Sequence, residues 1–350
     1  MTLQTQEPAS LKALNSFGVE ARARRLLALD DAADVDEALA AIADDPRVLV
    51  LGGGSNLLLA NDFDGTVLRV GLHGRRIVER EAAGRPALVE AAAGENWHDF
   101  VCWTLDQGLA GLENLSLIPG TVGASPIQNI GAYGIEMRSR FDSLLAVHRR
   151  SGERRRFEAA ACRFGYRDSV FKHADGRDWL ILSVRFRLAR ASDHAPVLDY
   201  GELREELAAF ASPTPLNVAR AVIAIRRRKL PDPAQLGNAG SFFRNPVVGH
   251  AQAEALAERH PGLPRYAVDT PHNTNDAGAE VKLSAAWLID QCGWKGYRDG
   301  DAGVHARHAL VLVNHGSATG AQLLALAERI AGSVRERFGV LLEPEPTIVR

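Results

Sequence analysis

The first of two glycine-rich loops has residue types suited to holding a phosphate group. It contains Gly52, Gly53 and Gly54, followed by Ser55 and Asn56. Successive backbone N–H groups that no side chain blocks form a concave site for an anion. A lone triple glycine is equally typical of a tight turn, so this loop by itself leaves both interpretations open.

The second loop, residues 119–134, combines glycines with hydroxyl and amide side chains. The glycines let the backbone approach a ligand closely, and the polar side chains supply hydrogen bonds. Two such loops in one half of the chain predict a large ligand that carries both phosphates and a flat polar ring. The residues expected to contact it are Gly52, Gly53, Gly54, Ser55, Asn56, Pro119, Gly120, Thr121, Val122, Gly123, Ala124, Ser125, Gln128, Asn129, Gly131, Ala132, Tyr133 and Gly134.

The first loop differs from the dinucleotide-binding loop of a Rossmann fold. That loop requires the pattern G-x-G-x-x-G at the start of a helix. Here Leu57 stands where the last glycine is required, and residues 57–62 lead quickly into another turn. The predicted order is therefore strand, glycine loop, strand.

The cysteines and histidines give no sign of a metal site. Cys102, Cys162 and Cys292 lie far apart without C-x-x-C spacing, which also argues against a disulfide framework and an oxidising compartment. His305 and His308 stand close together, but no H-E-x-x-H motif contains them. We therefore predict no catalytic metal.

Charge and hydropathy exclude several classes of partner. A formal net charge of -2 gives no general attraction to nucleic acid or to an anionic membrane. No apolar stretch approaches the roughly 18 residues that span a bilayer, and residues 1–8 do not resemble a secretory signal. We expect a cytoplasmic protein without nucleic-acid or membrane partners, and a monomer.

Hydrophobic periodicity predicts the elements that position the loops. A chain of 350 residues is too long for one ordinary core, so two or three domains are expected. A strand at 48–51 runs directly into the first loop, and Pro231 and Pro233 end the helix that Thr214 and Pro215 begin. Other strands are expected at 66–70, 87–93, 142–148, 180–188 and 309–314, and other helices at 30–43, 96–107, 251–259, 285–292 and 321–338.

Several segments, in order along the chain, resemble the UDP-N-acetylenolpyruvoylglucosamine reductase (MurB) family. They are the two glycine loops and residues 162–169 (CRFGYRDS), 229–233 (KLPDP), 237–246 (GNAGSFFRNP) and 342–345 (LEPE). Residues 15–18 (NSFG) resemble the family's opening N-T-F-G. The matches extend over about residues 12 to 348, which is nearly the whole chain.

The resemblance implies an α+β fold with a two-lobed FAD-binding domain of the vanillyl-alcohol-oxidase (PCMH) type and a C-terminal α+β substrate-binding domain. The corresponding ranges are 12–72 and 73–190 for the two lobes and 200–350 for the substrate domain. The polar stretch 189–196 is a plausible boundary between them.

The resemblance also implies the reaction. With bound FAD and NADPH as co-substrate, the family reduces UDP-N-acetylglucosamine enolpyruvate to UDP-N-acetylmuramate for peptidoglycan. Ser241 matches the family's proton donor, and Arg167 and Glu345 match the residues that polarise the substrate carboxylate and stabilise the enolate. Arginine suits this role because its planar fork binds a carboxylate through two hydrogen bonds, and Glu345 suits it when protonated.

Further residues are candidates for contact with the nucleotide sugar. Tyr200 matches the tyrosine loop of the longer type of the family, which folds over the substrate. Lys229 is expected to contact the diphosphate or the sugar, although a cation at a helix C-terminus also favours the helix dipole. The complete set of substrate candidates is Tyr166, Tyr200, Lys229, Asn245 and Lys282.

Two alternatives to the reductase remain open. One is another FAD-dependent oxidoreductase of the same fold that acts on a different substrate, and the other is a nucleotide-sugar-binding protein without catalysis. The combination of Ser241, Lys229 and Glu345 favours the reductase. The segment 261–280 is longer than expected for the family, and its role is open.

Overall fold

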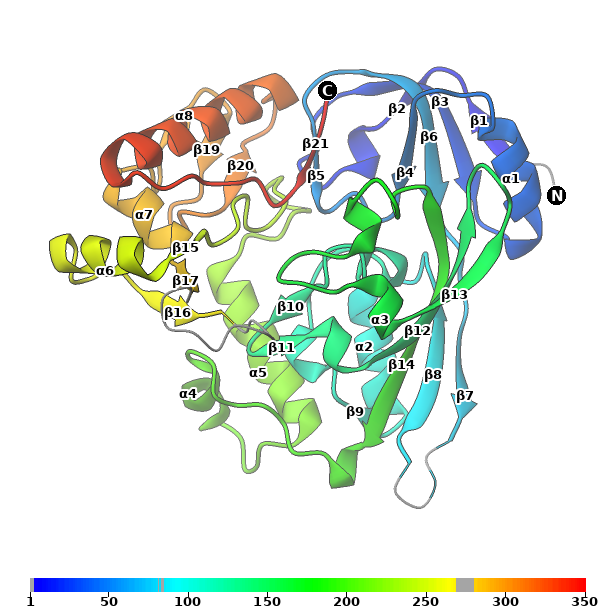
Figure 1. Cartoon of the computed structure of the whole chain (residues 1–350), viewed down its shortest axis with the longest axis horizontal. Coiled ribbons are helices and arrows are strands. Elements are labelled where there is room, and N and C mark those ends of the chain that lie inside the picture. Colours follow the sequence, from blue (N-terminus) through cyan, green and yellow to red (C-terminus); the bar gives the residue numbers. More distant parts are fainter. Residues whose placement is uncertain (1–2, 81, 83–84, 269–279) are drawn as a thin grey trace. The chain divides into compact units, whose positions relative to one another are not determined.

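The structure is a computed structural model that describes residues 3–80, 82, 85–268 and 280–350. The chain divides into two compact units, each built from separate stretches of sequence (Figure 1). Unit 1 comprises Met1–Ala9, Arg22–Gly54 and Phe63–Arg228, and unit 2 comprises Ser10–Ala21, Ser55–Asp62 and Lys229–Arg350. The division into 12–72, 73–190 and 200–350 uses other boundaries and stays a prediction.

The first sheet of unit 1 ends at the first glycine loop. Its strand order is β1-β3-β6-β4, with bounds Gln4–Gln6, Arg22–Leu29, Phe63–Val70 and Val48–Leu51. Strands β3 and β4 both run parallel to β6, and helix α1 (Val35–Ile42) buries one apolar face in the same core. The predicted strand 48–51 is confirmed, and Gly52 follows its last residue. The short strand β2 (Ala9–Ser10) lies where the chain passes from unit 1 to unit 2.

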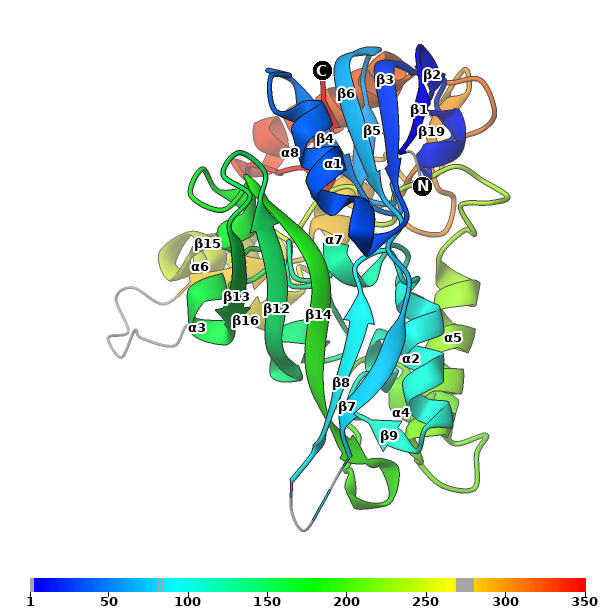
Figure 2. The same ribbon diagram turned by 90° about the vertical axis from the view of Figure 1, so that its right-hand side faces the viewer.

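The second sheet of unit 1 is antiparallel. Its order is β13-β12-β14-β8-β7, with bounds Arg154–Glu158, Phe141–His148, Trp179–Arg190, Ala87–Ala92 and Arg75–Glu79. Figure 2 shows β12, β14, β8 and β7 side by side. Helix α2 (Trp97–Asp106) packs Trp97 and Phe100 against Phe186 of β14, while β9 (Leu109–Ala110) pairs with the end of that strand.

Three further helices belong to unit 1. They are α3 (Ala159–Cys162), α4 (Leu203–Leu207) and α5 (Pro215–Lys229), of which α5 begins and ends as predicted. The buried face of α5 includes Val218, Val222 and Ile225, which form a cluster with residues of α4. Tyr133 of the second glycine loop packs against this cluster. The last residue of α5, Lys229, is the first residue of the third stretch of unit 2.

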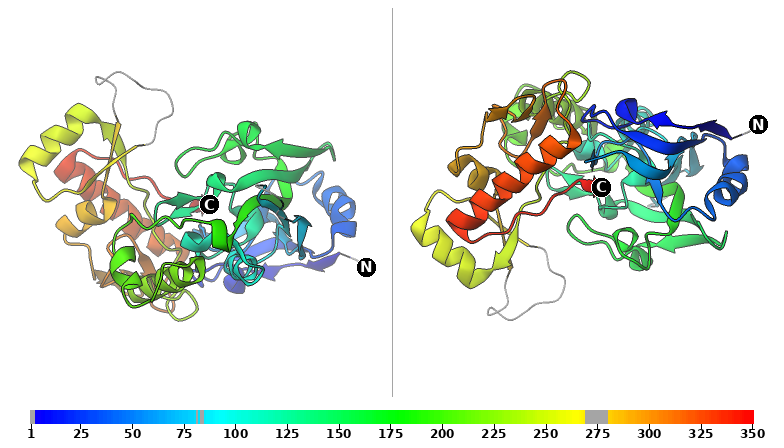
Figure 3. Two further views of the ribbon diagram at one scale, coloured as in Figure 1. Left: turned by 90° about the horizontal axis from the view of Figure 1, so that it is seen from below. Right: turned by 90° about the horizontal axis from the view of Figure 1, so that it is seen from above.

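Unit 2 has short strands and three helices. Its strands form the orders β15-β17-β16 (Val247–Gly249, Glu280–Leu283, Arg265–Ala267), β18-β19-β20 (Arg298–Asp299, Ala302–Val304, Leu312–Asn314) and β21-β5 (Thr347–Val349, Leu57–Leu59). Its helices are α6 (His250–Arg259), α7 (Ala285–Gln291) and α8 (Gly320–Phe338). Figure 3 shows α8, in orange-red, beside α7.

The predicted strand 66–70 after the first glycine loop lies within β6, and a short strand that was not predicted, β5, stands between them at residues 57–59. Strands β3, β7 and β13 were not predicted, because arginines alternate with or replace the apolar residues there. Most of the longer segment 261–280 lies outside the described residues, since 269–279 are not among them. No helix within the described ranges combines the length and hydrophobicity needed to cross a membrane.

Candidate active site

The two glycine loops of unit 1 lie against each other, backbone to backbone. A Cβ atom on Gly53 would lie 3.1 Å from the Cα of Gly120, and one on Gly52 would lie 2.6 Å from the Thr121 hydroxyl oxygen. Gly54 and Gly120 have φ angles of 61° and 113°, a region that favours glycine. Residues with side chains at these positions would separate the loops, so glycine is what allows them to form one cradle.

The second loop is anchored on the end of β8 and the start of α2. The N–H of Val122 donates to the carbonyl of Glu95 at 2.9 Å, and that of Gly123 donates to the carbonyl of Ala93 at 2.9 Å. The N–H of Trp97 donates to the carbonyl of Gly120 at 3.1 Å. A Cβ on Gly123 would lie 2.5 Å from the Cβ of Ala93, so close packing fixes this part of the loop.

Farther along the loop, polar side chains bond within the protein. The Ser125 hydroxyl donates to the carbonyl of Val122 at 2.7 Å. Asn129 is fully buried, and its amide donates to Glu136 and to the carbonyl of Gly165, both at 3.0 Å. Strands β10 (Gly131–Ala132) and β11 (Ile135–Glu136) pair next to it. A cofactor contact from Ser125 or Asn129 would therefore come mainly from the backbone.

Arg167 is held next to this loop in an unfavourable backbone conformation. It lies in a tight turn that Gly165 and Asp168 close with mutual backbone hydrogen bonds of 3.0 and 3.4 Å, and its φ is 54°. One Nη of Arg167 donates to the carbonyl of Gly131 at 2.7 Å, and the guanidinium lies over the Tyr166 ring, 5.5 Å from its centroid. Backbone strain at a non-glycine residue is often retained at functional sites.

A second arginine of unit 1, Arg226, was missed by sequence reasoning. Its Nε donates to the carbonyl of Leu117 at 3.2 Å, and burial lowers the pKa of its guanidinium, to which the positive charge of Arg167 contributes. Arg226 is half-buried, and no ion pair with a carboxylate is found for it among the described residues, so its charge suits an anionic ligand. The signal in the sequence is position: Arg226 follows the buried Val218 and Val222 at helical spacing.

In unit 2, Ser241 and Glu345 lie on adjacent backbone although they are far apart in sequence. The N–H of Glu345 donates to the carbonyl of Phe242 at 2.8 Å, and Phe243 bridges to Pro344. The Asn56 amide donates to the carbonyl of Glu345 at 3.3 Å. The parallel pairing of β5 with β21 thus brings Asn56, Ser241 and Glu345 together.

The loop that carries Ser241 is shaped by Asn238, which sequence reasoning did not select. The Asn238 side chain accepts from the N–H of Gly240 at 2.9 Å and donates to the carbonyl of Leu236 at 2.8 Å. Gly240, with φ of 69°, then turns the chain just before Ser241. These bonds fix the backbone that presents the Ser241 hydroxyl.

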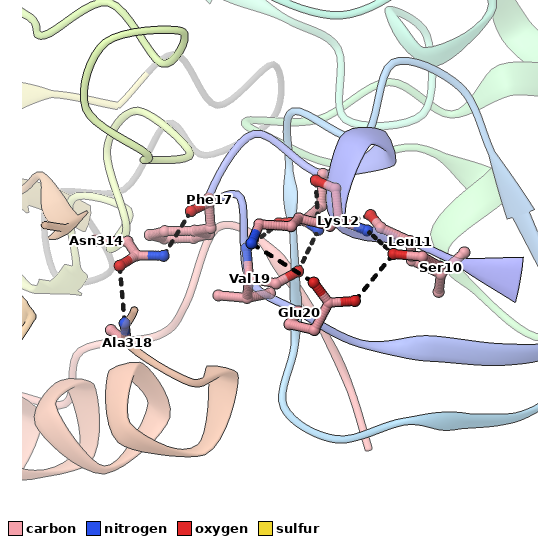
Figure 4. A network of polar contacts seen from close by, with 9 residues as sticks. Ser10, Leu11, Lys12, Phe17, Val19, Glu20, Asn314 and Ala318 are labelled. Atoms are coloured by element: carbon pink, nitrogen blue, oxygen red, sulfur yellow. Dashed lines mark hydrogen bonds and ion pairs between the residues drawn. The ribbon is translucent and has the colours of Figure 1, made fainter. Parts of the chain in front are cut away.

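The segment resembling N-T-F-G supports the same loop. The Asn314 amide donates to the carbonyl of Phe17 at 2.9 Å, and its oxygen accepts from Ala318 at 3.0 Å (Figure 4). The N–H of Asn314 donates to Gly237 at 2.8 Å, and a Cβ on Gly237 would collide with the carbonyl of Phe17. This N-terminal segment therefore has a structural role, because it packs against the loop that carries Ser241.

The candidate Lys229 of unit 2 lies near His308, which is half-buried. Burial lowers the pKa of His308, and the positive charges of His305 and Lys229 lower it further, which places Lys229 close to His308. The N–H of Phe242 donates to the carbonyl of Leu310 at 2.7 Å, so the loop that follows His308 adjoins the Ser241 loop.

The two remaining candidates in unit 2 have structural contacts of their own. The Asn245 side-chain oxygen accepts from the N–H of Ala285 at 3.0 Å, where α7 begins. Lys282 lies over the Tyr266 ring, 5.9 Å from its centroid. Among the candidates, Tyr166, Arg167 and Tyr200 belong to unit 1, and the lysines, Asn245, Ser241 and Glu345 belong to unit 2. No cluster of three or more His, Cys, Asp or Glu side chains in the described part of the chain is placed to hold a metal ion.

Comparison with known proteins decides the family. Residues 232–349 match the family described as the C-terminal domain of UDP-N-acetylenolpyruvoylglucosamine reductase, and residues 23–157 match an FAD binding domain. The UDP-N-acetylenolpyruvoylglucosamine reductase of Pseudomonas aeruginosa is 57% identical over 99% of this chain and 100% of its own. That of Chromobacterium violaceum is 56% identical over the full length of both. The chain belongs to this reductase family.

A solved structure supports the same fold. The crystal structure of UDP-N-acetylenolpyruvylglucosamine reductase (MurB) from Thermus caldophilus superposes with a TM-score of 0.67 at 24% identity, over 100% of both chains. The predicted α+β fold is confirmed as an FAD-binding domain followed by a reductase C-terminal domain. That this chain is of the type with a tyrosine loop stays a prediction.

The cradle of unit 1 fits FAD. A Cβ on Gly53 would meet Gly120, so both positions keep bare backbone, whose unblocked N–H groups suit a diphosphate. The buried positive charge of Arg226 suits a cofactor that gains negative charge on reduction. The chain is an FAD-dependent oxidoreductase.

Proposed function

We propose that this protein uses NADPH to reduce UDP-N-acetylglucosamine enolpyruvate to UDP-N-acetylmuramate, a cytoplasmic step in the synthesis of peptidoglycan precursors. The observation that carries the proposal is the assembly of Ser241 and Glu345 on adjacent backbone by the hydrogen bond from Glu345 to Phe242. Its family membership supports the substrate. The three free cysteines are consistent with a reducing compartment.

When bound, FAD would accept a hydride from NADPH and pass it to the enolpyruvyl double bond of the substrate. Arg167 binds the substrate carboxylate, and its hydrogen bond to Gly131 fixes the orientation of the guanidinium before substrate arrives. Holding the carboxylate in a fixed position also draws electron density away from the carbon that accepts the hydride. Arg226 adds a second positive charge.

Ser241 donates the proton to the carbon next to the one that received the hydride. Glu345, in its protonated form, donates a hydrogen bond to the enolate oxygen that forms between the two transfers. Both residues are half-buried, so few water molecules compete for these hydrogen bonds. After turnover the serine regains its proton from solvent.

The remaining candidates bind the two ligands. The cofactor contacts are those of the two loops, from Gly52 to Asn56 and from Pro119 to Gly134. Lys229 attracts the diphosphate, and Tyr166, Tyr200, Asn245 and Lys282 contact the sugar or nucleotide. Support for Lys229 comes from its positive charge, which is near enough to His308 to lower the pKa of that imidazole.

An anaerobic absorbance titration tests the proposal. NADPH is added to purified holoenzyme, followed by UDP-N-acetylglucosamine enolpyruvate, and the oxidised-flavin band is followed throughout. We expect bleaching by NADPH and recovery with the enolpyruvate. Bleaching without recovery would favour an FAD-dependent oxidoreductase with another substrate, and absence of bound flavin would contradict the proposed function altogether.

A further inference from the structure

Two adjacent buried residues of unit 1, Glu113 and Asn114, hold the segment 194–200, which ends in Tyr200. Both lie in the short helix η3 (Glu113–Leu115), and each is only 1% exposed. Because a buried polar group without a partner is costly, each side chain must find its hydrogen bonds nearby. Both find them in this segment.

Glu113 holds the start of the segment. Its Oε1 lies 2.6 Å from Nε2 of His194, and its Oε2 accepts from the N–H of Gly111 at 2.6 Å. The His194 side chain is 7% exposed, so the pair is shielded from water. Burial alone would raise the pKa of Glu113, but the hydrogen bonds from His194 and Gly111 lower it, and the carboxylate form is retained.

Asn114 holds the middle of the segment and joins it to the second glycine loop. Its single amide group donates to the carbonyl of Val197 at 2.8 Å and to the carbonyl of Tyr133 at 2.8 Å. A Cβ on Gly134 would lie 3.2 Å from the Val197 side chain, so segment and loop touch. The Tyr133 and Tyr200 rings then meet edge to face, with centroids 5.9 Å apart.

Tyr200 itself is weakly held at the surface. It is 52% exposed, and the ion pair between its neighbour Asp199 and Arg204 is also exposed. Exposed ion pairs contribute little to stability. Glu113 and Asn114 thus fix the segment upstream of Tyr200, while downstream the N–H of Leu203 donates to the Tyr200 carbonyl at 3.2 Å.

We propose that Glu113 and Asn114 are positioning residues, which set Tyr200 over the substrate by fastening segment 194–200 to the cofactor loop. The inference rests on the proposed function, in which Tyr200 contacts the nucleotide sugar. Under this inference, Glu113 and Asn114 raise the affinity for the substrate without contacting it, and they have no part in the reduction of the flavin.

A double-mutant cycle tests the inference in the holoenzyme. The variants are Asn114→Ala, Tyr200→Ala and both together, and Thr104→Val is the control. Thr104 is also 1% exposed in unit 1 and loses one hydrogen bond, to Val101, that is remote from the segment. KM for the enolpyruvate and the rate of flavin reduction by NADPH are measured separately.

We expect Asn114→Ala and Tyr200→Ala each to raise KM roughly tenfold, the factor that one net hydrogen bond corresponds to. Together they should raise KM scarcely further, because both act through one side chain. Flavin reduction should stay within about twofold of the wild type. Independent, multiplying effects on KM, or a parallel fall in flavin reduction, would overturn the inference.

Hydrogen–deuterium exchange separates failure of the inference from failure of the proposed function. Exchange in residues 194–200 should accelerate in Asn114→Ala and stay unchanged in Thr104→Val. If exchange there does not change, the positioning role is wrong whatever the kinetics. If exchange accelerates but Tyr200→Ala leaves KM unaltered, the clamp exists and the proposed contact between Tyr200 and the substrate is wrong.

Discussion

The turn that carries Arg167 allows backbone strain and function to be separated by substitution. Arg167 has a φ of 54°, and residues with a Cβ atom pay roughly 1–2 kcal/mol in that region. Both Arg167→Ala and Arg167→Gly lose the hydrogen bond to Gly131 and the contact with Tyr166. The difference between the two variants therefore isolates the strain of the backbone.

The expected difference is small but measurable. Glycine relieves the strain but gains freedom in the unfolded chain, which offsets about 0.4–1 kcal/mol. The net advantage of Arg167→Gly over Arg167→Ala is then on the order of 0.5–1 kcal/mol, or about 1–4 °C in melting temperature for a unit of this size. Thermal unfolding of the two holoenzymes, followed by circular dichroism, measures it.

Activity should not follow stability in this pair. Both variants lack the guanidinium that we propose binds the substrate carboxylate, and we expect kcat/KM for the enolpyruvate to fall about 10²–10³-fold in each. Arg167→Lys should lie between them and the wild type, since it retains the charge but lacks the planar fork. An alanine variant as stable as the glycine variant would refute the strain, and a glycine variant with normal turnover would refute the assigned role.

Three further predictions concern the loops and the first sheet. Gly53→Ala should reduce bound flavin strongly, because its new Cβ would meet the backbone of Gly120. The loss of flavin in Gly52→Ala should be reversed by Thr121→Ala, because the new Cβ there meets only the Thr121 side chain closely. The flavin-to-protein absorbance ratio measures both effects. Asn238→Ala should lower enolpyruvate turnover about tenfold with unchanged flavin reduction, since it releases the turn before the proton donor; stopped-flow of the two half-reactions measures this. Burial of the Asp45 side chain alone would raise its pKa. Hydrogen bonds from the Thr66 hydroxyl and the Arg47 backbone N–H, together with the charge of Arg24, instead lower this pKa below the ordinary 3.8. Its carboxylate therefore stabilises the fold above about pH 4 and loses this effect as pH falls further, so Asp45→Asn should flatten the decline of melting temperature between about pH 5 and 3.

The sequence predicted best the elements whose residues signal their own ends. The strand 48–51 and the helix that Pro215 begins were found at their observed bounds, since glycine and proline stop regular structure for local reasons. Strands β7 and β13 were missed because they carry exposed arginines and few buried residues. Their pairing with longer neighbours, which the local pattern does not encode, is what makes them strands.

The candidate site, too, could be predicted only in part from the sequence. Motif resemblance selected Ser241 and Glu345, but nothing in either segment predicts that one donates a backbone hydrogen bond to the neighbour of the other. Asn238 and Asn314 were overlooked because asparagine in a loop is usually a turn residue. Only the three-dimensional structure shows that these amides hold the backbone next to Ser241.

The interleaving of the two units gives the first glycine loop a double role. Gly52 to Gly54 belong to unit 1 and contact the second loop, whereas Ser55 and Asn56 belong to unit 2, where Asn56 bonds to Glu345. One short stretch of chain therefore connects Gly53, which lies against the second glycine loop, to Asn56, which bonds to Glu345. Strain introduced at Gly53 would therefore also change the backbone conformation at Asn56. It follows that substitutions at Gly53 should impair not only flavin retention but also the enolpyruvate half-reaction of whatever flavin remains bound. Substitutions at Gly123, which packs on Ala93, should impair retention without that second effect.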